Sequence, residues 1–169
     1  MRQSLLLLLV LLPALVLAQT PEERLTSLGI TLPTPSAPIA NYVKYVQTGN
    51  LLFLSGHGPC DRDHLGKVGD ELSIEEGYAS ARNTGICLLA TLKSAVGDLS
   101  RVKRIVRVFG MVNATADFTD HPKVINGCSD LMTEVFGENG KHVRAAVGMA
   151  SLPGDIPVEI EMIVELYEE

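Results

Sequence analysis

The 169-residue sequence predicts an α+β fold, in which a mixed β-sheet carries two helices on one face in the order ββαβαββ. Two segments, near residues 73–97 and 122–137, have apolar residues at helical spacing. Five short segments rich in Val, Ile, Leu and Phe surround them, as expected for strands. The two helical stripes are buried most simply when both helices pack on the same face of the sheet.

The first 18 residues have the pattern of a secretion signal. Met1-Arg2 supplies a positive charge, and Leu5–Leu17 is apolar apart from Pro13 but too short to span a bilayer comfortably. Val16-Leu17-Ala18 suits cleavage after Ala18. We expect a secreted or periplasmic protein that begins at Gln19 and has no membrane attachment after cleavage; the alternative is an uncleaved anchor.

Removal of 18 residues from 169 leaves 151, enough for one domain with a substantial core. Residues 19–41 contain Pro33, Pro35 and Pro38 and are expected to form an N-terminal arm, with one short helix at Pro21–Leu28. Residues 42–169 form the domain proper. It begins with two predicted strands, Tyr42–Gln47 and Leu51–Ser55.

Gly49-Asn50 is a suitable turn between these two strands. A polar, Gly-rich loop, Gly56–Asp70, follows the second strand directly, a position where functional sites often form. Ser73-Ile74-Glu75-Glu76 is a capping box that starts the main packing helix. The apolar stripe of that helix stops at Gly97, a suitable C-cap.

The second half of the chain predicts an interior strand, a helix and a hairpin. Val102–Val112 is rich in Val, Ile and Phe, as interior strands are. After a loop at Asn113–Thr119, Pro122 suits the first turn of a helix that closes at Gly137. The segments His142–Ala150 and Val158–Leu166 are expected to pair as a hairpin through Leu152-Pro153-Gly154-Asp155.

The charge balance argues against a nucleic-acid-binding protein. The chain has 14 Lys and Arg against 20 Asp and Glu, and loss of Arg2 with the signal leaves 13 − 20 = −7. Phosphate binding depends mainly on Lys and Arg, so such a surface repels nucleic acid. The four histidines are scattered, so loop or surface positions are expected and no metal site is predicted.

Three cysteines, Cys60, Cys87 and Cys128, cannot all pair within one chain. Cys87 and Cys128 lie on predicted helices among apolar residues, which favours buried thiols over cross-links; the pairing itself is left open. Asn113-Ala114-Thr115 fits the N-glycosylation pattern in a predicted loop, a pattern that often occurs by chance.

Arg144 is the most informative candidate for a site, because it lies in an otherwise uncharged strand, Val143–Ala150. Alternation places it on one face with Ala146, Gly148 and Ala150, which leave room beside a guanidinium suited to bidentate binding of a carboxylate or phosphate. Glu159 and Glu161 share a face of the last strand, and one of them lies near Arg144 if the hairpin register permits. The plainer interpretation is an ordinary salt bridge and two solvent-facing carboxylates.

The two C-terminal segments, His142–Pro153 and Val158–Ile163, resemble the C-terminal signature of the RidA/YjgF family, also called endoribonuclease L-PSP-like. The resemblance extends over residues 37–167 and includes Tyr42-Val43, Gly49–Leu52, Ser55-Gly56 and Asn126. It implies a chorismate-mutase-like α+β sandwich that assembles as a homotrimer with pockets between subunits.

The resemblance also implies an activity, the hydrolytic deamination of reactive 2-imino and 2-enamino acids to 2-keto acids and ammonia, without a cofactor. Arg144 then binds the substrate carboxylate and Glu159 positions the attacking water, while Tyr42, Ser55, Gly56 and Asn126 line or support the pocket. Ala146 replaces a cysteine that many relatives carry there, and the loop 60–70 and the connection 118–122 also differ.

Two alternatives remain open. The chain could be a non-catalytic trimer that binds small carboxylates through Arg144, because fold resemblance alone does not establish catalysis. A ribonuclease, suggested by the family's second name, is disfavoured by the acidic charge balance and the absence of an aromatic-and-basic pattern.

Overall fold

The computed structural model describes residues 19–168 apart from residue 39. The predicted secretion signal lies outside these described residues. Within them, no helix is both long and apolar enough to cross a membrane. The elements are α1 (Pro21–Ser27), β1 (Tyr45–Thr48), β2 (Leu51–His57), α2 (Ile74–Val96), β3 (Val102–Asn113), α3 (His121–Phe136), β4 (Val143–Met149) and β5 (Val158–Leu166), with short 3₁₀ turns at Leu99–Arg101, Gly137–Gly140 and Pro153–Asp155.

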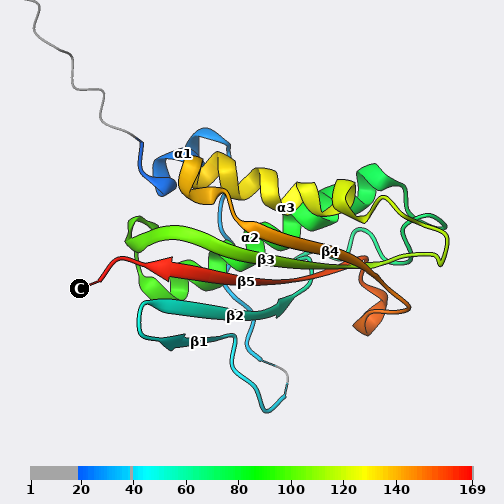
Figure 1. Ribbon diagram of the computed structural model, residues 1–169, viewed down its shortest axis with the longest axis horizontal. Coiled ribbons are helices and arrows are strands. Elements are labelled where there is room, and N and C mark those ends of the chain that lie inside the picture. The colour runs from blue at the N-terminus through cyan, green and yellow to red at the C-terminus, as the bar shows by residue number, and fades with distance from the viewer. Residues whose placement is uncertain (1–18, 39, 169) are drawn as a thin grey trace, which may run out of the picture.

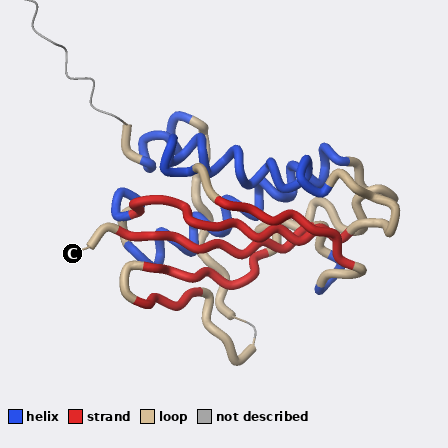
Figure 2. Tube along the Cα trace, in the orientation of Figure 1, coloured by secondary structure: helices blue, strands red, loops and turns tan. Residues whose placement is uncertain are grey.

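The five strands form one mixed sheet in the order β1-β2-β5-β3-β4. Neighbouring strands are antiparallel except β3 and β4, which are parallel and are joined through α3. In Figure 1 α2 passes behind the strands, and α3 runs beside the β4 edge. Figure 2 shows the same separation of helices from strands. The predicted α+β class is therefore confirmed, with α1 as a third, short helix.

The predicted hairpin between the last two strands is wrong. β4 and β5 do not pair, because β3 lies between them and pairs with both. A helix connects β3 to β4, so β4 can lie parallel to β3 at the sheet edge, as crossover connections allow. β5 then crosses to the other side of β3 and fills the position between β2 and β3. The predicted hairpin and the observed strand order give the same alternation of buried and exposed residues within each strand.

The helix boundaries follow the predicted caps. The Ser73 hydroxyl accepts a hydrogen bond from the Glu76 amide at 3.2 Å, and the Glu76 carboxylate accepts one from the Ser73 amide at 2.8 Å. α2 ends before Gly97 and α3 before Gly137, whose φ angles of 80° and 61° are in the region that favours glycine.

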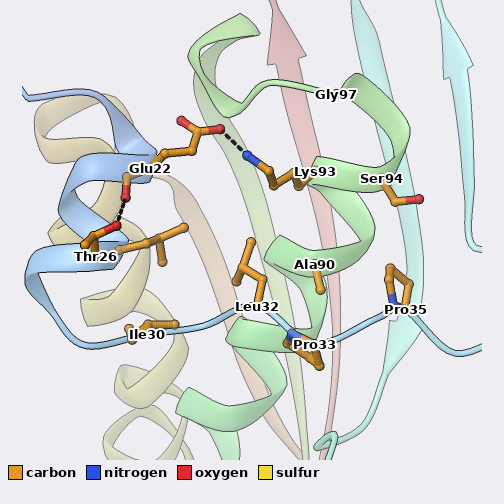
Figure 3. Close-up of a pocket in the computed structure, with 11 residues that line it drawn as sticks. Glu22, Thr26, Ile30, Leu32, Pro33, Pro35, Ala90, Lys93, Ser94 and Gly97 are labelled. Carbon is orange, nitrogen blue, oxygen red and sulfur yellow. Dashed lines mark hydrogen bonds and ion pairs between the residues drawn. The ribbon is translucent and has the colours of Figure 1, made fainter.

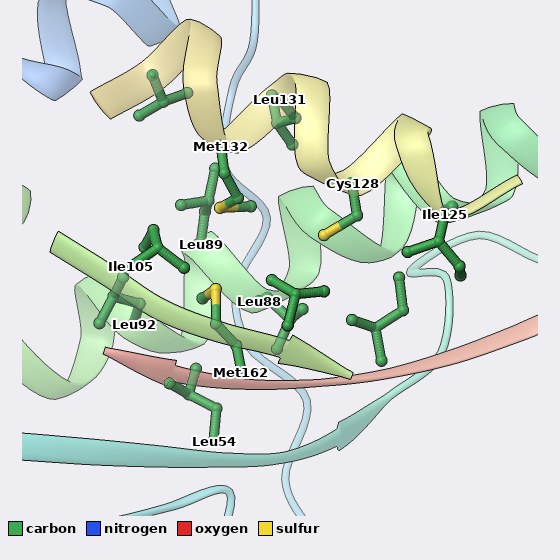
Figure 4. Close-up of a cluster of buried hydrophobic side chains, with 14 of the residues drawn as sticks. Leu54, Leu88, Leu89, Leu92, Ile105, Ile125, Cys128, Leu131, Met132 and Met162 are labelled. Carbon is green, nitrogen blue, oxygen red and sulfur yellow. The ribbon is translucent and has the colours of Figure 1, made fainter. Parts of the chain in front are cut away.

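The core lies between the helices and one face of the sheet (Figure 4). β5 supplies a row of alternate side chains to it, each no more than 1% exposed: Val158, Ile160, Met162, Val164 and Leu166. Gly127 lets α3 approach α2 closely, because a Cβ there would overlap the Tyr78 backbone oxygen. Leu25 of α1 is also part of the core, so the N-terminal arm packs onto the helical layer.

Several side chains differ from their sequence-based assignment. Cys87 is buried as expected, but it forms a disulfide with Cys60 that ties the loop after β2 to α2. Cys128 is a free buried thiol, as predicted, and burial raises its pKa to about 12. His57 is 5% exposed and packs against Thr91 of α2, so the expectation of loop or surface histidines is wrong for this residue.

Asn113 ends β3 rather than beginning a loop, and it is only 1% exposed. Its side-chain amide donates to Gly66 O and to the Asp155 carboxylate, while its oxygen accepts from Lys67 Nζ at 2.9 Å. Residue 113 therefore joins two loops, and its buried amide is not presented for glycosylation.

Candidate functional site

The Arg144 guanidinium is held against α3 by neutral oxygen atoms. Nη1 donates to Asn126 Oδ1 at 2.8 Å and to Ser129 Oγ at 2.9 Å, and Nη2 donates weakly to Pro122 O at 3.5 Å. Asn126 and Ser129 are three residues apart on α3 and so present their side chains on one side of the helix. The structure thus brings together two of the predicted site residues, Arg144 and Asn126.

These contacts leave part of the guanidinium available to a ligand. A guanidinium has five N–H donors. Both Nη1 hydrogens and one Nη2 hydrogen are used, so the Nε–H and the second Nη2–H remain as a side-on fork. No carboxylate of the described chain neutralises Arg144, because its hydrogen-bond partners there are an amide, a hydroxyl and a carbonyl. The side chain is thus a pre-positioned cation with a fork that fits a carboxylate.

Glu159 occupies a second, separate place, above Gly56. A Cβ at position 56 would overlap the Glu159 carboxylate, so the carboxylate lies directly on the β2 backbone where the β2–β5 register shifts. Burial first, and then the negative charge of Glu161, raise the pKa of the Glu159 carboxyl above its usual value. A carboxylate with a raised pKa is a stronger base, which suits proton abstraction from water.

Ser55 stands next to this carboxylate site along β2. Its hydroxyl oxygen is buried and has no hydrogen-bond partner within the described residues. Buried hydroxyls normally have a partner, so an unsatisfied one beside a candidate site marks a position for a ligand or water. Tyr42 precedes β1, is 42% exposed, and has Lys44 Nζ 6.0 Å from its ring centre.

Arg144 and Glu159 do not face each other within one chain. The registers pair Val108 with Arg144 and Met111 with Glu159. Val108 is in the core, so Arg144 points to the helix-covered side, at the sheet edge. Glu159 alternates with the core residues Val158 and Ile160 and so lies on the opposite face. The condition under which one of the two glutamates would lie near Arg144, a hairpin register that places them on one face, is therefore not met within one chain.

The candidate site residues therefore lie in two separate clusters of the chain, which we call half-sites. One consists of Arg144 with Asn126 and Ser129, and the other of Glu159 with Ser55 and Gly56. Ser129 and the Pro122 carbonyl were not predicted from the sequence, although the spacing of Ser129 from Asn126 was a signal for the first.

The face of the sheet without helices is partly apolar. The paired registers place one row across all five strands: Val46, Phe53, Ile163, Arg107 and Val143. Three of these apolar side chains are 40–67% exposed, Phe53, Val46 and Val143. Exposed apolar residues gathered on a sheet face are typical of surfaces that contact another molecule. We call this surface the open face.

Two connections that differ from the family pattern border the Arg144 side of β4. His121, at the start of α3, packs its ring over Gly148. A Cβ at position 148 would overlap His121 Nε2, so the histidine ring fills the space beside this glycine. Phe118 meets the His121 ring edge-on at 5.2 Å. Lys67, in the loop after β2, donates to Ala150 O just beyond β4.

A separate groove of about 550 Å³ lies between the N-terminal arm and α2 (Figure 3). Ile30, Leu32 and Pro33 line one side of it, and Glu22 pairs with Lys93 across its end at 2.8 Å. It contains none of the predicted site residues. No cluster of His, Cys, Asp and Glu that could hold a metal ion occurs among the described residues.

The chain is similar to several known proteins. Residues 22–166 match the YjgF/chorismate-mutase-like endoribonuclease family. Protein TCP17 of Trypanosoma cruzi is 43% identical over 146 residues, which cover 84% of this chain and 91% of that protein. The 2-iminobutanoate/2-iminopropanoate deaminase of Salmonella typhimurium is 31% identical over 140 residues, which cover 79% and 94%.

Among solved structures, an Agrobacterium tumefaciens protein of unknown function is 41% identical, with a TM-score of 0.81. The match covers 87% of this chain and 92% of that one.

Proposed function

Because the chain belongs to the YjgF/chorismate-mutase-like endoribonuclease family, we propose that it hydrolyses 2-imino acids, and the 2-enamino acids in equilibrium with them, to 2-keto acids and ammonia. One relative, at 31% identity, carries the name of such a deaminase. The observation that carries the proposal is the Arg144 guanidinium, held by Asn126 and Ser129 without a neutralising carboxylate. Such a cation matches the carboxylate common to these substrates.

In the proposed reaction, Arg144 binds the substrate carboxylate and so fixes the position of the iminium carbon. Glu159 takes a proton from water as the water oxygen attacks that carbon. Glu159 returns that proton to the nitrogen of the resulting carbinolamine. It then takes the hydroxyl proton as the C=O bond forms and the C–N bond breaks, so that ammonia and the 2-keto acid leave and the proton passes from Glu159 to solvent. The iminium carbon is already electrophilic, so orientation and one base suffice, and the scheme uses no cofactor.

The proposed active site forms between subunits of a homotrimer. Arg144 and Glu159 lie on opposite faces of the sheet, so a site that uses both takes them from two chains. The exposed apolar row of the open face supports such an assembly, because burying Phe53, Val46 and Val143 against a neighbour removes them from water. Light scattering on the domain from residue 19 should give three times the chain mass.

Kinetics with freshly generated 2-iminopropanoate test the activity. Arg144→Ala should lower kcat/KM by roughly 30- to 1,000-fold, and Arg144→Lys should not restore it, since an ammonium lacks the planar fork. Glu159→Gln should lower kcat by about 10²- to 10⁴-fold, while 2-keto acid binding persists. Arg24→Ala, on α1, is the matched control for loss of an arginine, and Glu138→Gln, in the turn after α3, is the control for loss of a carboxylate.

The alternative is a protein that binds small carboxylates without catalysis. It predicts that the unmodified chain binds pyruvate, that Arg144→Ala does not, and that neither releases ammonia faster than buffer. If Arg144→Ala and the unmodified chain release ammonia equally fast, and both faster than buffer, neither function holds as stated.

We also propose that the protein is secreted or periplasmic and is cleaved after Ala18. The disulfide between Cys60 and Cys87 supports this proposal, since disulfides persist in oxidising compartments. N-terminal sequencing of the exported protein should begin at Gln19. A membrane-bound chain that retains Met1 would contradict the proposal.

A further inference from the structure

His142 lies next to the Arg144 half-site and has no part in the proposed reaction. It directly precedes β4, and its position two residues before Arg144 places both side chains on the same side of the strand. Ser129 of α3 connects them, because its hydroxyl lies 3.0 Å from His142 Nε2 and 2.9 Å from Arg144 Nη1.

The hydrogen-bond directions along this chain follow from the groups at its ends. His142 Nδ1 lies 2.7 Å from Gly140 O, which can only accept, so Nδ1 carries the hydrogen. In the neutral ring Nε2 is then an acceptor, and the Ser129 hydroxyl must donate to it. The Ser129 oxygen therefore presents a lone pair, not a hydrogen, to the Arg144 guanidinium.

The ring is kept neutral and in place by its surroundings. Burial first, and the Arg144 charge as well, lower the pKa of His142, although the hydrogen bond to Gly140 opposes them. Gly140 is buried against α3, where a Cβ would overlap the Met132 backbone oxygen. The carbonyl that fixes the tautomer is thus anchored to the helix that carries Ser129.

Without His142, the Ser129 hydroxyl would lose the acceptor that fixes its hydrogen. A serine hydroxyl in a helix readily turns to the carbonyl of the preceding turn. The Arg144 side chain would then keep only Asn126 as a strong partner and would have more rotamers to lose when a ligand binds.

We propose that His142 is a positioning residue, which acts through Ser129 to hold the Arg144 guanidinium in its carboxylate-binding orientation. The consequence for the reaction rests on the proposed function, whereas the effect on Arg144 itself does not. The substrate carboxylate is bound in both the ground state and the transition state, so loss of His142 should raise KM more than it lowers kcat.

Two measurements test this role, with His142→Leu, Ser129→Ala, both together, and His142→Gln. In nitrogen-15 NMR, the unmodified chain should show His142 protonated at Nδ1 only, and a resolved Arg144 Nη signal. His142→Leu and Ser129→Ala should each broaden that signal, and His142→Gln, whose amide can both donate and accept, should restore it. A Nε2-protonated His142, or an Arg144 signal unchanged in His142→Leu, would overturn the proposal.

Calorimetry with pyruvate supplies the second readout. His142→Leu should weaken binding by about two- to tenfold, the range expected when one long side chain must be ordered on binding. Ser129→Ala should weaken it at least as much, and the double variant no further than Ser129→Ala, because His142 acts through Ser129. Additive losses would overturn the proposal. If the unmodified chain binds no keto acid, the proposed function fails, and the NMR result decides the positioning role alone.

Discussion

The two faces of the sheet are built from the same strands and differ in what covers them. On β5, the residues toward the helices are at most 1% exposed, whereas Glu159, Glu161, Ile163 and Glu165 alternate with them on the open face. The covered face holds one chain together. The open face combines carboxylates with exposed apolar side chains such as Phe53, which are suited to contact with a second chain. The covered face thus serves folding, and the open face is the surface that the proposed assembly and chemistry would use.

Phe53→Asp should have the largest effect, because it disrupts the open face and leaves the covered face unchanged. A charge placed in the middle of the open face would be buried in the proposed assembly, and burying an unpaired charge is costly. We expect a folded monomer by light scattering and circular dichroism, with no deaminase activity. Leu28→Asp is the matched control, since Leu28 and Phe53 are 41% and 40% exposed but Leu28 lies on the arm. A Phe53→Asp chain that remains trimeric would show that the open face is not the interface.

Leu88→Ala should have the opposite effect to Phe53→Asp: it should lower the stability of the fold and leave the assembly intact. Leu88 of α2 is fully buried, and replacing a buried leucine with alanine costs about 2–5 kcal/mol of unfolding free energy. Urea denaturation should show this loss of unfolding free energy. Under conditions in which Leu88→Ala is folded, its assembly and its kcat should be unchanged. A cost below about 1 kcal/mol would mean that the helix-covered face is not the principal core.

Glu161→Gln should give the smallest effect and concerns the acid limb of the pH profile. Glu159 must be ionised to act as base, so activity is lost as the pH falls through its raised pKa. Glu161 contributes to that raised pKa, after burial, so removing its charge should shift the limb of kcat/KM to lower pH. Lys141→Ala, in the turn before β4, should leave the limb in place. An unchanged limb in Glu161→Gln would indicate a different base.

The sequence predicted local structure better than strand pairing. The capping box at Ser73 and the glycines at 97 and 137 depend on neighbours a few residues away, and each lies where predicted. The partners of β4 and β5 depend on how the chain crosses β3. Alternation within Val143–Met149 and Val158–Leu166 is the same for a hairpin and for the observed order, so the pattern could not distinguish them.

Part of the candidate site could likewise be identified from the sequence, and part could not. Arg144 was identifiable because a charge in an apolar strand is conspicuous, and Asn126 because it matches the family pattern. Ser129 was not singled out, although its spacing from Asn126 was a signal, and His142 was noted only as the start of the C-terminal segment. The approach of α3 to β4 is what joins both to Arg144. The disulfide was also missed, since the composition around Cys87 is that of a buried thiol whether or not it is paired with Cys60.

The central claim, that two chains supply one site, is tested by mixing two inactive variants. Arg144→Ala keeps Glu159, and Glu159→Gln keeps Arg144, so both groups are intact in a site that takes its arginine half from Glu159→Gln and its glutamate half from Arg144→Ala. In trimers assembled at random from equal amounts, about one site in four has this composition, because each boundary pairs the arginine half of one chain with the glutamate half of the next. We therefore predict about a quarter of the unmodified deaminase activity after co-expression. Activity no higher than that of the separate variants would contradict a shared site.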